Sequence, residues 1–224
     1  MSQPIVYCIP GLGANEGMWA NQEELPLEFR HIKMVAPKHP KMTMAEYATQ
    51  LMEQIDTEGP INLMGVSMGG MLAVEIAKQI ETRKVLAISS SKTANELPPP
   101  IRWIGKTFLP DLLPAKWFKR ILKWYANKLT NLTEDYKILY GEMVDSLPDA
   151  FVHWAAKGIS RWNNETVPKT VFHIHGTHDK VLPYQFVQAD VSIPGARHYM
   201  IALKADVLNP MILEQFTVLR KKEK

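Results

Sequence analysis

The 224-residue sequence is poor in cysteine and has no long apolar run. Its single cysteine, Cys8, excludes an intrachain disulfide, which is typical of proteins in the reducing cytoplasm. No stretch reaches the ~18 apolar residues of a membrane-spanning helix, and the first residues lack the basic and then apolar segments of a secretory signal. We therefore expect a cytoplasmic protein without a transmembrane segment.

The chain also lacks a strong excess of charge and the usual nucleotide-binding patterns. Its formal net charge is +3 with 22% charged residues, which does not favour nucleic acid as a partner. No Gly-Lys-Ser/Thr follows its glycine-rich loop at 11–17, and the glycines there do not have the G-x-G-x-x-G spacing of dinucleotide-binding loops. We expect no nucleic-acid partner.

Short apolar runs alternate with helical patterns along most of the sequence. Strands are expected at residues 5–9, 32–35, 61–66, 85–89, 171–175 and 190–193, and helices at 43–56, 68–80, 184–188 and 204–221. This alternation is typical of βαβ units, in which helices cover both faces of a parallel sheet. We predict an α/β fold, a three-layer sandwich around a mostly parallel sheet of roughly six strands.

Residues 95–167 interrupt the alternation. This segment has no good strand pattern, begins near three prolines at 98–100, and holds five of the six tryptophans. Its position between two strands predicts a helical cap inserted into a core that consists of residues 1–94 and 168–224. The alternative is an additional helical layer whose tryptophans pack into the ordinary core.

One pattern, Gly65-Val66-Ser67-Met68-Gly69, lies where a predicted strand turns into a predicted helix. Glycines on both sides permit a sharp turn, because a Cβ there would collide with the neighbouring strand or helix. Such a turn, a nucleophile elbow, holds the Ser67 hydroxyl above the sheet at the start of a helix. Ser67 is therefore the candidate nucleophile of a serine hydrolase or of a close mechanistic relative.

A serine nucleophile needs a base that takes its proton and an acid that orients the base. In a parallel sheet these partners lie in loops at the carboxyl ends of later strands, in the order serine, acid, histidine. Asp179 follows the strand expected at 171–175, and His198 follows the strand expected at 190–193. Alone, Asp179 is as typical of a turn or helix cap as of a catalytic acid, and His198 is more typical of a surface loop, but together they predict a Ser67-His198-Asp179 triad.

Acyl transfer also needs hydrogen-bond donors aimed at the developing oxyanion. The backbone N–H of Met68 directly follows the nucleophile. The loop Pro10-Gly11-Leu12-Gly13 follows the first strand, and its glycines allow an N–H group to point inward. We predict that the oxyanion hole consists of the N–H groups of Leu12 and Met68.

Taken together, these motifs resemble the α/β-hydrolase superfamily. The resemblance covers the glycine-rich loop with its tryptophan at 11–19, the elbow at 65–70, the acid loop at 175–179 and the histidine loop at 195–198. It implies that Ser67 is the nucleophile, His198 the general base and acid, and Asp179 the residue that orients His198. Pro10 stands where this family usually has a histidine that helps to hold the oxyanion loop.

The expected activity is hydrolysis of a carboxylic ester, or of a thioester, through an acyl-enzyme, with no metal and no organic cofactor. A same-fold enzyme of another reaction, such as a C–C bond hydrolase, a lyase or a cofactor-free peroxidase, is the alternative. A non-catalytic binding module with the same fold is a further alternative.

The predicted cap gives the main indications of the substrate. The candidate substrate-binding residues are Trp19, Trp103, Trp117, Trp124 and His178. Between residues 101 and 130 a single acidic residue, Asp111, stands against seven basic ones: Arg102, Lys106, Lys116, Lys119, Arg120, Lys123 and Lys128. This balance suits a carrier-linked acyl group, an anionic substrate or an anionic membrane surface, whereas a solvated helix face is the simpler explanation for any one lysine. We expect a small ester or acyl substrate, and the pattern leaves the oligomeric state open.

Overall fold

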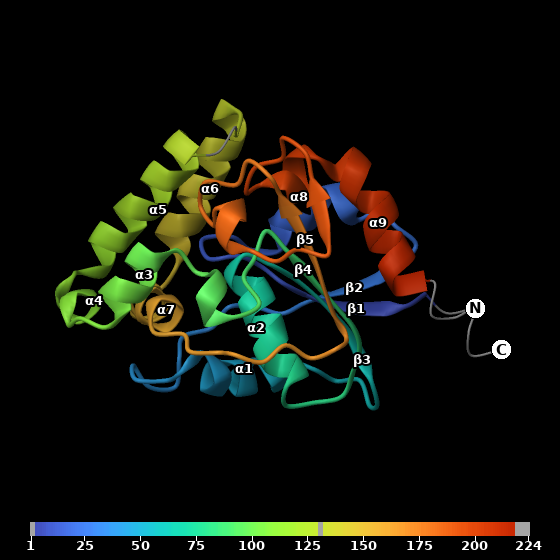
Figure 1. Cartoon of the computed structure of the whole chain (residues 1–224), viewed down its shortest axis with the longest axis horizontal. Coiled ribbons are helices and arrows are strands. Elements are labelled where there is room, and N and C mark those ends of the chain that lie inside the picture. The colour runs from blue at the N-terminus through green and yellow to red at the C-terminus, as the bar shows by residue number, and fades with distance from the viewer. Residues whose placement is uncertain (1–2, 130–131, 218–224) are drawn as a thin grey trace.

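Six strands form one sheet in the order β2-β1-β3-β4-β5-β6, and every neighbouring pair is parallel (Figure 1). The computed structural model describes residues 3–129 and 132–217. The strands are β1 (Ile5–Ile9), β2 (Glu28–His31), β3 (Ile61–Val66), β4 (Thr82–Ile88), β5 (Val171–Gly176) and β6 (Val191–Ile193). The predicted α/β sandwich with a mostly parallel six-stranded sheet is confirmed.

The edge strand β2 lies earlier in the chain than the sequence pattern predicts. The predicted range 32–35 is wrong, because β2 spans Glu28–His31, where Val6 of β1 pairs with Phe29. An edge strand meets solvent along one side, so it needs no continuous apolar run, and the apolar residues that prompted the prediction follow the strand.

Helices cover both faces of the sheet and complete the three layers (Figure 1). α1 (Met44–Met52) and α2 (Met68–Ala77) pack on one face. α9 (Ala205–Thr217), α8 (Met200–Leu203) and the 3-10 helix η1 (Glu16–Gln22) pack on the other. The sheet therefore divides the core into two apolar clusters.

Side chains of β1 alternate between the two clusters. Tyr7 and Ile9 belong to the cluster under α1 and α2, whereas Val6 and Cys8 belong to the cluster under α9. Cys8 is completely buried, and burial raises the pKa of its thiol well above the ordinary value. Cys8 is therefore a neutral core residue and no nucleophile.

The helix expected at 43–56 is α1, which ends earlier than predicted. It begins with a capping box, in which the Thr43 hydroxyl accepts from the N–H of Glu46 while the Glu46 carboxylate accepts from the N–H of Thr43. This reciprocal cap fixes the helix start.

Other predicted helices are also shorter in the structure. The range 68–80 contains α2, and 184–188 contains only one 3-10 turn, η3 (Tyr184–Phe186). The range 204–221 contains α9, but residues 218–221 lie outside the described residues.

The segment between β4 and β5 is mostly helical. Its elements are η2 (Ala94–Glu96), α3 (Pro99–Gly105), α4 (Leu109–Leu112), α5 (Ala115–Leu129), α6 (Glu134–Ser146) and α7 (Asp149–Ser160). Figure 1 shows α3 to α7 gathered at one end of the molecule. α7 contributes fully buried side chains to the core under α1 and α2: the Trp154 indole N–H donates to the Met42 carbonyl at 2.7 Å, and its ring lies 4.0 Å from that of Tyr47. The division at 95–167 stays a prediction, and α7 shares the core of the remaining chain; we use the word cap below only as a name for the helices α3 to α7.

Candidate active site

Ser67 lies at the turn between β3 and α2, with φ 55° and ψ −122°. It is one of two non-glycine residues with positive φ in the part of the chain that the structure describes. Hydrogen bonds hold this strained backbone: the N–H of Ser67 donates to the Ile88 carbonyl at 3.0 Å, and the Ser67 carbonyl accepts from the Ser90 hydroxyl at 2.7 Å. This conformation is the strained strand-to-helix turn that the sequence pattern predicts.

Two glycines allow β1, β3 and α2 to approach one another at this turn. A Cβ on Gly65 would collide with the backbone of Gly69, and a Cβ on Gly69 would collide with the carbonyl of Ile9. Because these obstacles are backbone atoms, no side-chain adjustment relieves them. The glycines therefore fix the height of Ser67 above the sheet.

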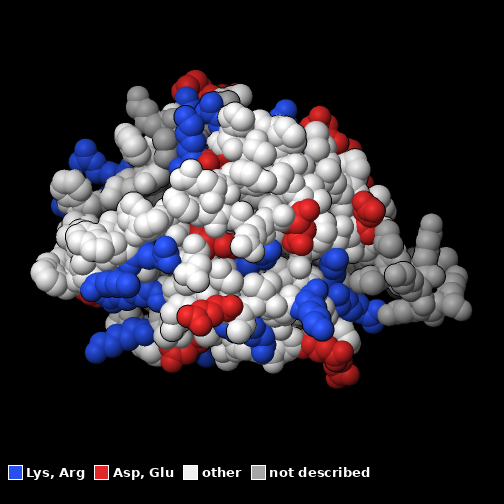
Figure 2. Space-filling model, in the orientation of Figure 1, with Lys and Arg blue, Asp and Glu red and all other residues white. Residues whose placement is uncertain are grey.

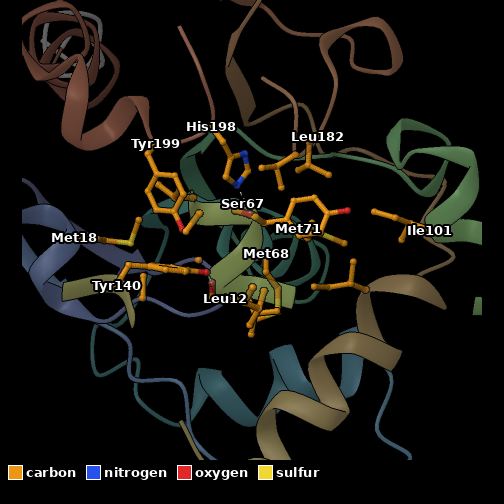
Figure 3. Close-up of a pocket in the computed structure, with 18 residues that line it drawn as sticks. Leu12, Met18, Ser67, Met68, Met71, Ile101, Tyr140, Leu182, His198 and Tyr199 are labelled. Carbon is orange, nitrogen blue, oxygen red and sulfur yellow. Dashed lines mark hydrogen bonds between the residues drawn. The ribbon is translucent and has the colours of Figure 1, made fainter. Parts of the chain in front are cut away.

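The structure brings Ser67, His198 and Asp179 together from three loops at the carboxyl ends of β3, β6 and β5, and Figure 3 shows His198 above Ser67. His198 Nε2 lies 3.0 Å from Ser67 Oγ, and His198 Nδ1 lies 2.8 Å from Asp179 Oδ2. The Asp179 carboxylate only accepts, so Nδ1 carries the hydrogen and the neutral ring presents Nε2 as an acceptor to the serine hydroxyl. With these contacts, His198 Nε2 can accept the proton of the Ser67 hydroxyl.

Asp179 is buried, yet its environment favours the charged carboxylate. Burial alone raises the pKa of Asp179, but His198, with a smaller contribution from His175, outweighs it, so the net pKa lies below the ordinary value. Its second oxygen accepts from the N–H groups of Val181 and Leu182 at 2.8 and 2.9 Å. Asp179 is therefore both a turn residue and the partner of His198: one carboxylate oxygen holds its own loop, and the other accepts from His198.

Sequence reasoning missed a pair of buried histidines on β5. His175 Nε2 lies 2.9 Å from the Leu182 carbonyl and 3.4 Å from Asp179 Oδ2, and His175 Nδ1 lies 3.1 Å from His173 Nε2. A carbonyl only accepts, so Nε2 of His175 carries the hydrogen, and Nδ1 accepts from His173. Burial lowers the pKa of both rings, so both are neutral, and the N–H of His175 donates to the Leu182 carbonyl in the loop that carries Asp179.

The residues predicted to supply the oxyanion donors both lie next to Ser67. Leu12 and Met68 both line the cavity at Ser67, and Figure 3 shows them on the side of Ser67 opposite His198. A Cβ on Gly11 would lie 3.4 Å from the Ser67 Cβ, so the Leu12 loop passes close to the nucleophile. Among the described residues, neither the Leu12 nor the Met68 N–H donates to a protein group, so both are available to a ligand.

The cap holds the Leu12 loop through Tyr140 of α6. The Tyr140 hydroxyl donates to the Leu12 carbonyl at 3.1 Å, and burial raises the pKa of Tyr140 to about 12, so it stays a donor. Gly13 has φ +89°, and a Cβ there would lie 2.5 Å from the Tyr140 oxygen. Pro10 has no side-chain donor, whereas the Tyr140 hydroxyl contacts the same loop from a distant part of the sequence. No local sequence signal points to this residue.

A cavity of about 180 Å³ opens beside Ser67 (Figure 3). Its walls come from the oxyanion loop, the elbow, the histidine loop and the cap, and they are mostly apolar. The cap contributes Ile101, Leu122, Tyr125, Ala126, Tyr140 and Ile159. An apolar group of the substrate fits this lining.

None of the five predicted substrate-binding residues lines this cavity. Trp19 is buried in the core cluster under α9, whereas Trp103, Trp117, Trp124 and His178 are exposed. The aromatic lining comes instead from tyrosines, which carry no pattern that distinguishes them from other helix residues.

Two further features are absent from the described residues. No helix within residues 3–129 and 132–217 combines the length and hydropathy needed to cross a bilayer. In the same ranges, no cluster of three or more histidine, cysteine, aspartate or glutamate side chains could hold a metal ion.

The parallel sheet and the elbow at Ser67 define the α/β-hydrolase fold. A hydrolase from Pseudomonas aeruginosa PA01 aligns with a TM-score of 0.73 at 13% identity, over 96% of this chain and 90% of that one. An esterase from Thermogutta terrifontis aligns with a TM-score of 0.67 at 18% identity, over 96% and 92% of the two chains. BorB, a type II thioesterase from the borrelidin biosynthetic cluster, gives 0.65 at 14% identity, over 96% and 93%.

The chain thus has the α/β-hydrolase fold, which confirms the resemblance found in the sequence. At identities this low, the similarity establishes the fold alone. A family model described as the thioesterase domain matches residues 23–90, which is less than half of the chain but includes the elbow. No curated protein sequence matches significantly.

Proposed function

We propose that the protein is a serine hydrolase that cleaves a carboxylic ester or a thioester. The observation that carries the proposal is the continuous contact from Ser67 Oγ through His198 to Asp179, at 3.0 and 2.8 Å. The thioesterase-domain match at residues 23–90 and the fold shared with esterases support the same reaction class. A binding module without catalysis needs no such contact.

In the first half of the proposed reaction, Ser67 Oγ attacks the substrate carbonyl while His198 Nε2 takes its proton. Asp179 stabilises the resulting imidazolium, and the N–H groups of Leu12 and Met68 donate to the oxyanion. When the tetrahedral intermediate collapses, the bond to the leaving oxygen or sulfur breaks, and His198 returns the proton to that atom. An acyl group remains on Ser67.

In the second half, a water molecule attacks the acyl-enzyme while His198 takes its proton. The second tetrahedral intermediate releases the carboxylic acid, and His198 returns the proton to Ser67. Every step uses groups of this chain, so the proposal includes no metal and no organic cofactor.

The cavity suggests a small apolar group on the substrate. An apolar protein cavity of about 150 Å³ takes up benzene, and the cavity beside Ser67 measures about 180 Å³. We therefore expect short acyl or aryl groups to react faster than long chains. A carrier-linked acyl group is the alternative form of the substrate, and a carrier-bound thioester in the same assay tests it.

A fluorophosphonate probe tests the chemistry without knowledge of the substrate. We expect it to label the wild-type protein and not Ser67→Ala, while Ser91→Ala, a buried serine at the end of a different strand, is labelled like the wild type. A panel of esters and thioesters of graded chain length then defines the substrate. A wild-type protein that resists the probe, or a Ser67→Ala variant that is labelled equally, contradicts the proposal.

A further inference from the structure

Large apolar side chains crowd the outer surface of α3, α4 and α5. Of the twelve large apolar side chains exposed in the described part of the chain, seven lie between residues 103 and 124. Five of these are more than half exposed: Trp103 (68%), Phe108 (74%), Leu112 (67%), Trp117 (52%) and Trp124 (53%). We refer to the exposed side chains of residues 103–124 as the cap face. Such a concentration marks an interaction surface, because monomeric proteins rarely expose large contiguous apolar areas.

The apolar side chains of α5 form one broad arc, whose inner part lines the cavity and whose outer part is exposed. Trp117, Ile121 and Trp124 follow one another at helical spacing on its exposed side. Leu122 and Tyr125 line the cavity beside Ser67. A helix with water on its outer side normally carries polar residues there, so the outer side of α5 is suited to an apolar environment.

The cap face also carries an excess of positive charge. Lys106, Lys116 and Arg120 are exposed, and none of them has an acidic partner among the described residues. The guanidinium of Arg120 lies over the Trp117 ring at 5.8 Å. Figure 2 shows basic side chains beside an uncharged surface at the cap end of the molecule.

Neighbouring charges do not cancel this excess. Asp111 is the only acidic residue between positions 99 and 127, and it is paired with Arg161. Lys119 and Lys123 of α5 are paired with Asp149 and Asp145 at 2.8 and 2.7 Å. The three unpaired cations therefore give the cap face a net positive charge.

We propose that the cap face binds the surface of an anionic lipid bilayer. Tryptophan and phenylalanine insert favourably at the boundary between headgroups and acyl chains, and lysine and arginine beside them attract anionic headgroups. A fluid lipid surface accepts several separate apolar side chains on short helices without a shape-matched partner, whereas a protein partner would have to be complementary to all of them. The combination of exposed tryptophans and unpaired cations thus favours lipid over an acidic protein.

This inference goes beyond the proposed hydrolysis and does not depend on it. The same two helices, α3 and α5, carry the cap face and line the cavity through Ile101 and Leu122. Binding to a bilayer would bring the cavity close to apolar esters that partition into lipid.

Vesicle sedimentation tests the proposal. We expect the wild-type protein to pellet with vesicles of phosphatidylcholine and phosphatidylserine, and to bind vesicles of phosphatidylcholine alone at least about tenfold more weakly. The triple variants Trp103→Ala/Trp117→Ala/Trp124→Ala and Lys106→Glu/Lys116→Glu/Arg120→Glu should each bind the anionic vesicles at least about tenfold more weakly than the wild type. Val35→Ala/Tyr184→Ala, which truncates exposed side chains outside the cap, should bind like the wild type, and thermal melting shows whether each variant is folded.

Three outcomes overturn the proposal. The wild-type protein stays in the supernatant with anionic vesicles, or a folded tryptophan variant binds them as tightly as the wild type does. In the third outcome, the wild-type protein does not bind vesicles but self-associates or binds an acidic acyl carrier protein, and the tryptophan variant no longer does so. The fluorophosphonate assay is read separately, so failure of lipid binding and failure of the hydrolase proposal are distinguishable.

Discussion

At the scale of single residues, Asp179 combines a structural and an electrostatic task. One carboxylate oxygen accepts two backbone N–H groups of its own loop, and the other accepts from His198. The loop contacts fix where the carboxylate lies, and the charge fixes which nitrogen of His198 carries the hydrogen.

Asp179→Asn separates these two tasks. The amide oxygen still accepts from the loop, but the charge that stabilises the imidazolium is lost. We expect the fold to persist while the kcat for a reactive ester falls about 10³–10⁴-fold. Asp206→Asn, an exposed carboxylate on α9, serves as the control. Retention of wild-type kcat in Asp179→Asn would exclude Asp179 as the orienting acid.

His175 offers a second prediction at this scale, since its N–H donates to the Leu182 carbonyl in the loop that carries Asp179. His175→Leu removes this donor, and we expect kcat to fall up to about tenfold with little change in KM, because the loop that positions Asp179 loses a hydrogen bond that contributes about 0.5–1.5 kcal/mol. His175→Gln can place an amide N–H near the same position and should restore most of the rate. Equal losses in both variants would indicate that the imidazole acts only through packing.

At the scale of elements, the contact between α3 and α7 depends on a glycine. A Cβ on Gly105 would collide with the carbonyl of Ser160 at the end of α7. The Ser160 atoms that the Cβ would meet belong to the main chain, so the collision can be relieved only if one of the two helices shifts. The cap therefore joins the core through a close helix crossing.

Gly105→Ala should lower the free energy of unfolding by about 1–3 kcal/mol, because the added methyl group pushes α3 away from α7. Gly141→Ala on α6 is the matched control: its Cβ would find only the Lys123 side chain at 3.8 Å, so alanine there should stabilise the helix by about 0.5–1 kcal/mol. Denaturant unfolding of both variants measures the difference. Equal stability of the two would mean that α3 and α7 are not in close contact.

The sequence predicts those parts of the fold and site that depend on residues close together in the sequence. The elbow is recognisable because glycine is required at 65 and 69, where backbones approach this closely, and Asp179 and His198 lie in the loops that follow β5 and β6. The edge strand β2 escapes prediction because its Glu-Phe-Arg-His sequence has no apolar run.

Contacts between segments that lie far apart in the sequence produce no recognisable sequence pattern. Tyr140 is 128 positions away from Leu12, and only the packing of α6 brings the two together. Among the cap tryptophans, Trp154 is buried in the core while Trp117 is exposed, although both lie in amphipathic helices. Which side of a helix meets the core depends on how the whole cap packs.

At the scale of the whole molecule, the buried histidines of β5 make stability depend on pH. Burial lowers the pKa of His173 well below its ordinary value of about 6.5 and lowers that of His175 as well, and the nearby Lys92 adds to the effect on His173. The unfolded chain therefore binds more protons than the folded chain below about pH 6.5. Because both folded pKa values are depressed, their contribution is complete above about pH 6.5 and is lost as the pH falls toward the folded values.

We expect the free energy of unfolding to fall as the pH drops below about 6.5, with a contribution from the two groups of at most about 2.7 kcal/mol per pH unit. His173→Gln, which keeps a donor for His175, should remove about half of this slope. Phe172→Leu, its neighbour on β5, controls for a local loss of packing and should keep the wild-type slope. Urea unfolding at several pH values measures the slope of the free energy of unfolding against pH. An unchanged slope in His173→Gln would contradict the assignment of a neutral buried ring.

The hydrogen bond from Tyr140 to the Leu12 carbonyl limits how substrate can enter. Any movement that lifts α6 would break this bond and withdraw the tyrosine that lies against Gly13, so the loop carrying the Leu12 N–H would lose its support at the moment of entry. A route into the cavity that leaves this hydrogen bond intact keeps the oxyanion loop in place, and the walls from α3 and α5 do not contact that loop through Tyr140. Entry past α6 would therefore disturb the catalytic groups, whereas entry elsewhere along the cavity wall would not.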